Sequence, residues 1–198
     1  MLNADAALLR LKQGNEIFRS NTSYMDVDKA SRSIFVKKQT PFAIILGCSD
    51  SRVPSELVFG QGLGELFVVR VAGNTAMTSQ IGSIEFAVDS FSIKLIVVLG
   101  HSYCGAIKAT IESLEDARKI SSPNLQAIID SIKPGVEFTF DPEDSHDTKV
   151  QKAVRANVRS MTQKLLSDSI ILQQKVAEDG LKIVGAEYCI ESGMVRFF

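Results

Sequence analysis

Three apolar runs of strand length constrain this chain most. They read PFAIILG (41–47), ELFVVRVAG (65–73) and IKLIVVLG (93–100), and each ends at a glycine. None shows the regular polar alternation of a half-exposed strand, so they predict strands buried on both faces, as in a parallel sheet. Two later runs, 181–189 and 194–198, predict a fourth and a fifth strand.

Helical patterns separate these strands. Residues 78–91 carry apolar residues at helical spacing and predict a crossover helix, and further helices are predicted over 3–20, 150–165 and 168–178, the last closed by Gly180. Residues 121–148 contain several prolines and acidic residues, which predicts mainly surface loop with a short helix at 123–132.

The alternation of strands and helices predicts an α/β fold. We expect a single domain over 1–198 with an N-terminal helical arm at about 1–35. Its centre should be a mostly parallel sheet of four strands plus a C-terminal edge strand, flanked by helices.

Composition excludes several classes of partner. The net charge is −1 and there is no basic stripe, so we expect no nucleic acid as a partner. No apolar run approaches the roughly 20 residues of a membrane span, and the N-terminus does not read as a secretory signal. Three cysteines make a poor disulfide framework, which favours a reducing, cytoplasmic location.

Reactive side chains gather where two predicted strands end. Cys48 follows the first strand in LGCSDSRVP, and His101 and Cys104 follow the third in VVLGHSYCGA. Ligands in such sheets bind beyond the carboxyl ends of the strands. Two thiolates and an imidazole suit tetrahedral zinc and leave a fourth position, which Asp50 could fill or control. The alternative is a buried packing cysteine and an ordinary hydrogen-bonded histidine.

Three other stretches carry motif-like patterns. LGHSYCG places Ser102 as in a G-x-S-x-G nucleophile elbow, but Cys104 occupies the last position, and the other histidine, His146, lies in a polar loop. A serine or cysteine hydrolase is therefore a weaker alternative. The GQGLGE stretch (60–65) predicts a turn rather than a phosphate loop, and Cys189 predicts a packing residue.

CSDSRVP followed by GHSYCGA resembles the β-class carbonic anhydrases, and the resemblance extends through GELFVVRVAGN and GSIEFAV. It implies that one zinc ion per chain is bound by Cys48, His101 and Cys104, beside a catalytic dyad of Asp50 and Arg52. It further implies a homodimer or a dimer-of-dimers tetramer, with a substrate pocket at a subunit interface lined by Gln39, Phe67, Phe86 and Gly105. If these two residues do not line such a pocket, we expect Gln39 to be a solvated turn residue and Phe86 a helix core residue.

The resemblance implies a lyase, carbonic anhydrase, that reversibly hydrates carbon dioxide to bicarbonate and a proton. Arg52 would hold Asp50 through a bidentate pair, and Asp50 would join the zinc ligands only in a closed, low-pH state. The chain has no tryptophan, and Ile45 stands where a bicarbonate-inhibited subtype carries one, which disfavours that subtype. A hydrolase of a related molecule such as carbon disulfide, and a non-catalytic zinc-binding relative, are the alternatives.

Overall fold

The fold is built on one five-stranded sheet. The structure is a computed structural model that describes residues 2–20, 36, 39–116, 120, 122–139, 141 and 143–198. The strands are β1 (Ala43–Gly47), β2 (Leu66–Arg70), β3 (Leu95–His101), β4 (Lys182–Tyr188) and β5 (Val195–Phe197). Their order is β2-β1-β3-β4-β5, with the first four parallel and β5 antiparallel to β4. The predicted fold class is confirmed.

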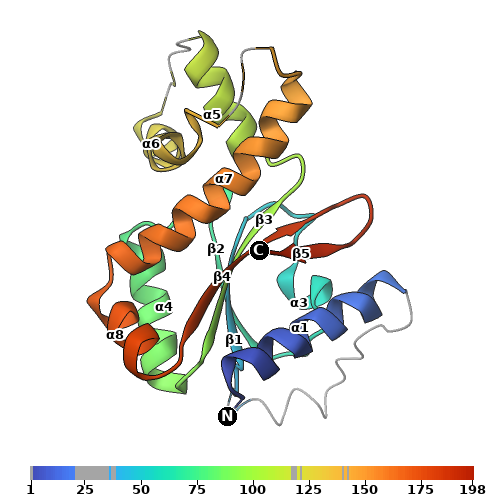
Figure 1. The fold of residues 1–198 in the computed structure, drawn as a ribbon, viewed down its shortest axis with the longest axis vertical. Helices are drawn as coiled ribbons and strands as arrows, with labels where there is room; N and C mark the ends of the chain where they lie inside the picture. The colour runs from blue at the N-terminus through green and yellow to red at the C-terminus, as the bar shows by residue number, and fades with distance from the viewer. Residues whose placement is uncertain are drawn as a thin grey trace.

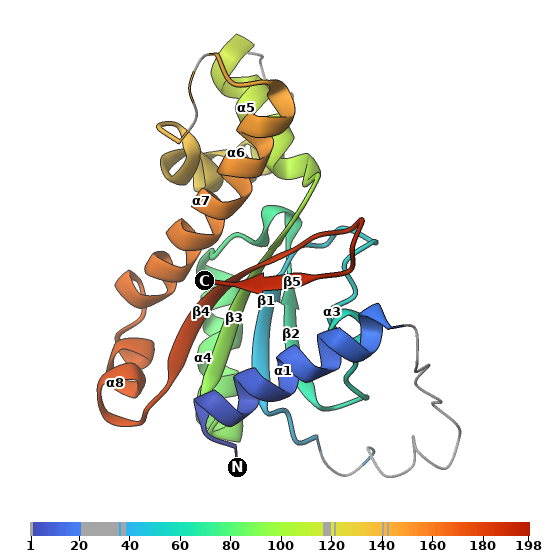
Figure 2. The same ribbon diagram turned by 45° about the vertical axis from the view of Figure 1, so that its right-hand side comes forward.

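Helices cover both faces of this sheet (Figures 1 and 2). They are α1 (Ala4–Arg19), α3 (Ser55–Val58), the 3-10 turn η1 (Ala72–Asn74), α4 (Thr78–Phe91), α5 (Gly105–Asp116), α6 (Pro123–Val136), α7 (His146–Ser167) and α8 (Ile170–Glu178). α1 and α3 lie on one face, and α4, α8 and the second half of α7 on the other. α5, α6 and the start of α7 form a lobe beyond the carboxyl ends of the strands. In the described part of the chain, no helix has the length and apolar character needed to cross a membrane.

Successive side chains of the central strands enter different cores. Ile44 of β1 belongs to the same buried core as Ile84 of α4, whereas Ile45 belongs to the core that contains Leu11 of α1. All five residues of β1 and all seven of β3 are buried. This two-sided burial is why these strands lack polar alternation.

The prediction that residues 121–148 are mainly loop is wrong over much of that range. α6 extends to Val136, past the expected short helix, and α7 already begins at His146. Pro123 occupies the first turn of α6, where its missing N–H costs nothing, and the Ser122 hydroxyl caps that turn by accepting from the Leu125 N–H. Burial of the apolar face formed by Ile129, Ile132 and Val136 carries the helix past Pro134.

The other expected elements are close to those observed. α8 ends as predicted, with Gly180 in the left-handed conformation just beyond it. Gly60 and Gly64 also have positive φ, which agrees with a turn at GQGLGE. Of the expected N-terminal arm, α1 is observed, and residues 21–35 lie outside the described residues.

Two glycines let α7 approach the sheet closely. A Cβ at Gly100 of β3 would lie 2.6 Å from a methyl carbon of Val158, and one at Gly185 of β4 would lie 2.8 Å from its other methyl carbon. Real Cβ contacts are longer, so no larger residue fits either position without a shift of α7. Because Gly100 precedes His101, this contact fixes the end of β3.

Candidate metal centre

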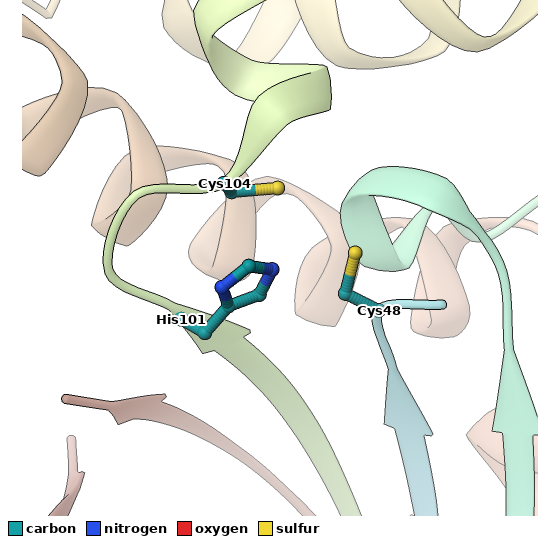
Figure 3. Close-up of side chains that lie close together, drawn as sticks. All are labelled: Cys48, His101 and Cys104. Carbon is teal, nitrogen blue, oxygen red and sulfur yellow. The ribbon is translucent and has the colours of Figure 1, made fainter. Parts of the chain in front are cut away.

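Three side chains converge at the carboxyl edge of the sheet. Cys48 follows β1, Cys104 precedes α5, and His101 is the last residue of β3 rather than the residue after it. β1 and β3 are neighbouring parallel strands, which brings their ends together. The side chains point toward one another (Figure 3), and their ligand atoms all lie within 4.8 Å of one another. All three residues are buried.

The imidazole of His101 is oriented for ligation. Its Nδ1 lies 2.9 Å from the carbonyl oxygen of Ser102, which can accept the Nδ1 proton and leave the lone pair on Nε2. Nε2 is buried and has no hydrogen-bond partner among the described residues. A buried nitrogen without a partner, facing two sulfur atoms, fits a metal ion.

The two thiols also fit a cation. The Cys104 thiol lowers the pKa of Cys48, and the same proximity raises the pKa of Cys104. Two buried sulfur atoms this close share one negative charge unless a positive charge lies between them. The Gly73 N–H, 3.4 Å from the Cys48 sulfur, further supports a thiolate there. Two thiolates and an imidazole are ligands that zinc prefers.

Asp50 lies beside this cluster and is held by Arg52. The Arg52 side chain donates from Nε to Oδ1 at 2.9 Å and from Nη2 to Oδ2 at 2.8 Å, and its backbone N–H donates to Oδ1 at 3.0 Å. These contacts hold the pKa of Asp50 well below its usual range. Oδ2 is 4.0 Å from Nε2 of His101, so the carboxylate borders the point where the ligands converge.

Arg70 is a site residue that sequence reasoning missed. From the end of β2 it donates to the carbonyl oxygen of Cys48 at 2.9 Å and to that of Asp50 at 2.6 Å. It therefore fixes the backbone of the segment that carries both side chains. The sequence signal that could have identified it is a single cation inside the apolar run 65–73, near the end of the predicted strand.

Of the four residues expected to line the pocket, Gly105 lies beside the cluster and the other three lie away from it. Gly105 begins α5, next to Cys104. Phe67 pairs with Ile44, four residues before Cys48, which is about 13 Å along a strand. Phe86 packs against Phe67, with ring centroids 6.4 Å apart, and it is 58% exposed, so it is not a helix core residue. Gln39 is exposed and precedes the opposite end of β1. One chain alone does not bring these three residues to its own cluster.

Ser102 and Cys189 lie outside the metal cluster. The Ser102 hydroxyl accepts a hydrogen bond of 3.0 Å from the Ile190 N–H, so it anchors the turn between β4 and β5. Ser102, His146 and Cys189 all line a separate cavity of about 630 Å³. Cys189 follows β4 and is partly buried.

The fold and this site define an α/β protein with a buried Cys₂His cluster, fit to hold a metal ion, at the carboxyl edge of a parallel sheet. A family model described as "Carbonic anhydrase" matches residues 43–195. Carbonic anhydrase 2 of Mycobacterium tuberculosis is 34% identical over 194 residues, covering 96% of this chain and 91% of that protein. The carbonic anhydrase of Mycolicibacterium smegmatis is 34% identical over 195 residues, covering 98% and 93%.

A solved structure agrees with these relatives. The β-carbonic anhydrase CcaA has a TM-score of 0.74 to this chain at 26% identity, covering 96% of this chain and 94% of that one. The chain belongs to the β-carbonic anhydrase family.

Proposed function

We propose that this protein reversibly hydrates carbon dioxide to bicarbonate and a proton, with one zinc ion held by Cys48, His101 and Cys104. The observation that carries the proposal is the buried Nε2 of His101, which faces two thiols and a carboxylate and finds no hydrogen-bond partner in the part of the chain that the structure describes. Bound zinc would lower the pKa of a water molecule and so supply a nucleophile for carbon dioxide.

Asp50 acts as an acceptor beside the reacting atoms, and Arg52 positions it. Asp50 is ionised across the neutral range, because the pair with Arg52 lowers its pKa. A carboxylate 4.0 Å from Nε2 could itself bind the metal if it were released. The bidentate contact turns both carboxylate oxygens toward the guanidinium and keeps the fourth coordination position free for substrate chemistry.

The substrate pocket is proposed to lie between two copies of the chain. Gly105 would come from the copy that supplies the metal ligands, and Gln39, Phe67 and Phe86 from the other, since they lie far from their own cluster. The exposed ring of Phe86, packed with Phe67 and Phe91, is an apolar surface that suits burial in an interface. The proposed assembly is a homodimer or a tetramer built from two such dimers, with the dimer as the smallest active unit.

Light scattering combined with the hydration assay tests this assembly. Phe86→Arg places a charge on the apolar surface, so we expect a monomer that keeps its zinc and loses activity. Leu125→Arg, on an exposed position of α6 away from that surface, is the control and should leave the dimer intact. A wild-type monomer with full activity would refute a shared pocket.

A reducing, cytoplasmic location is also proposed, because Cys48 and Cys104 must remain thiols to bind metal. Fractionation of cells that express the native gene, followed by immunodetection, tests it, and recovery outside the cytoplasm would count against it.

Stopped-flow measurement of carbon dioxide hydration tests the proposed reaction. We expect activity that disappears when a chelator removes the metal and returns when zinc is restored. Survival of full activity after complete metal removal would contradict the proposal. A parallel assay with carbon disulfide distinguishes a hydrolase, and zinc-loaded protein without hydration activity would indicate a non-catalytic relative.

A further inference from the structure

The loop that joins His101 to Cys104 has a disfavoured backbone conformation. Tyr103 has a φ of 59°, in the left-handed region, which residues with a Cβ rarely adopt. Such a conformation persists only where surrounding contacts impose it, and these positions are frequent at functional sites. The contacts that impose it here are therefore informative.

Three hydrogen bonds tie this loop to the last residue of β4 and to the turn that follows it. The Ser102 N–H donates to the Tyr188 carbonyl oxygen at 2.9 Å, and the Ser102 hydroxyl accepts from the Ile190 N–H at 3.0 Å. The third bond joins side chains, with the Tyr103 hydroxyl donating to Oε1 of Glu191 at 2.8 Å. The first two fix Ser102, and the third fixes the residue that follows it.

Tyr103 in turn contacts Arg52. Its carbonyl oxygen accepts a hydrogen bond of 3.3 Å from Nη2 of Arg52, the same nitrogen that donates to Asp50 at 2.8 Å. The Arg52 side chain is 49% exposed, and among the described residues its hydrogen bonds go to Asp50 and to the Tyr103 carbonyl oxygen. The orientation of the Tyr103 carbonyl is thus one of the few supports that hold Arg52 against Asp50.

We propose that Tyr103 and Glu191 are positioning residues that hold Arg52 in the orientation in which it binds Asp50. The inference rests on the proposed function, in which that contact keeps the fourth metal position free. The tyrosine–glutamate bond fixes the loop, the loop presents its carbonyl to Arg52, and Arg52 retains the carboxylate. In the described part of the chain, the side chains of these two residues bond to each other, and neither residue belongs to the Cys48–His101–Cys104 cluster.

The arrangement allows a clean test because Tyr103 is 52% exposed and lines the 630 Å³ cavity. Tyr103→Phe removes one hydroxyl without leaving a buried void, and Glu191→Ala removes the acceptor. Glu191→Gln keeps an acceptor oxygen and is the rescue variant. Ser192→Ala, in the same turn but without contact to the tyrosine hydroxyl, is the matched control.

Loss of one hydrogen bond typically changes an equilibrium by about threefold to tenfold. We therefore expect Tyr103→Phe and Glu191→Ala each to lower kcat for carbon dioxide hydration by about that factor, with KM and zinc content unchanged. The double variant should lose no more than either single one, because both act through the same bond. Glu191→Gln and Ser192→Ala should retain wild-type kcat.

Amide hydrogen exchange supplies a readout that does not depend on activity. The Arg52 N–H donates to Oδ1 of Asp50, so loosening of the pair should speed its exchange by about threefold to tenfold in Tyr103→Phe and Glu191→Ala. Unchanged exchange at Arg52 in both variants would overturn the inference, as would equal loss of kcat in the glutamine variant. Absence of hydration by the wild type would instead refute the proposed function, and exchange would still decide the positioning role.

Discussion

Replacement of Gly100 by alanine tests whether the packing of α7 against β3 fixes the position of His101 in the proposed metal centre. The new methyl group would lie 2.6 Å from a methyl carbon of Val158, so α7 and β3 must separate by about 1 Å to reach an ordinary contact. Overpacking of this kind costs about 1–3 kcal/mol. For a chain of this size, that lowers Tm by about 2–12 °C.

The same substitution should weaken metal binding. His101 adjoins Gly100, and a ligand site tolerates displacements of about 0.5 Å. We expect zinc affinity, measured by competition with a chromogenic chelator, to fall about tenfold, the lower end of the effect of disturbing a ligand's support. Thermal unfolding followed by circular dichroism gives the stability change on the same preparation.

Two further variants make this prediction specific. Val158→Ala removes the methyl carbons that clash, so Gly100→Ala with Val158→Ala should be more stable than the sum of the single effects by at least about 1 kcal/mol. Gly135→Ala is the matched control, because its Cβ would lie 2.5 Å from the Ser160 Cβ but adjoins no metal ligand. It should lower Tm without lowering zinc affinity. A Gly100→Ala protein with wild-type Tm and affinity would refute the packing argument.

Arg52→Ala is expected to keep its zinc, by elemental analysis, and to lose most hydration activity even at high pH, because Asp50 is free to reach the metal. A variant as active as wild type would rule out the proposed role of Arg52 in holding Asp50 away from the metal. The wild-type rate constant should rise from pH 7 to 9. Three neutral imidazoles bring the pKa of zinc-bound water to about 7, and two thiolates leave the ion less able to activate water than that. Asp50 does not titrate in that range, because its pKa is lowered rather than raised, so a profile flat from pH 6 to 9 counts against the account. Cys189→Ala should keep both metal and activity, whereas Cys48→Ala should lose both.

The sheet could be predicted because a strand buried on both faces is apolar along its whole length. Ile44 and Ile45 enter different apolar cores, so burial favours an apolar side chain at both positions. α6 was not predicted at full length because its prolines indicated a loop. Pro123 lies in the first helical turn, where proline is well tolerated. The burial of Ile132 and Val136 offsets the cost of Pro134 inside the helix, and no local sequence pattern reveals that burial.

The convergence of Cys48, His101 and Cys104 could be predicted because their spacing within CSDSR and HSYC is local, and the carboxyl ends of neighbouring parallel strands meet. Arg70 could not, because its role depends on the register between β1 and β2. The contact between Tyr103 and Glu191 joins residues far apart in sequence, and only the fold brings them together. The placement of Phe67 and Phe86 away from their own cluster likewise became visible only from the strand register.

The central claim is that Cys48, His101 and Cys104 hold one zinc ion on which carbon dioxide hydration depends. It is tested most directly by elemental analysis and stopped-flow hydration on the same samples of wild type and Cys104→Ala. The account predicts about one zinc per chain and activity in the wild type, because one Cys₂His set is present, and loss of both in the variant. Full zinc retention by Cys104→Ala, or hydration by a preparation free of metal, would contradict it.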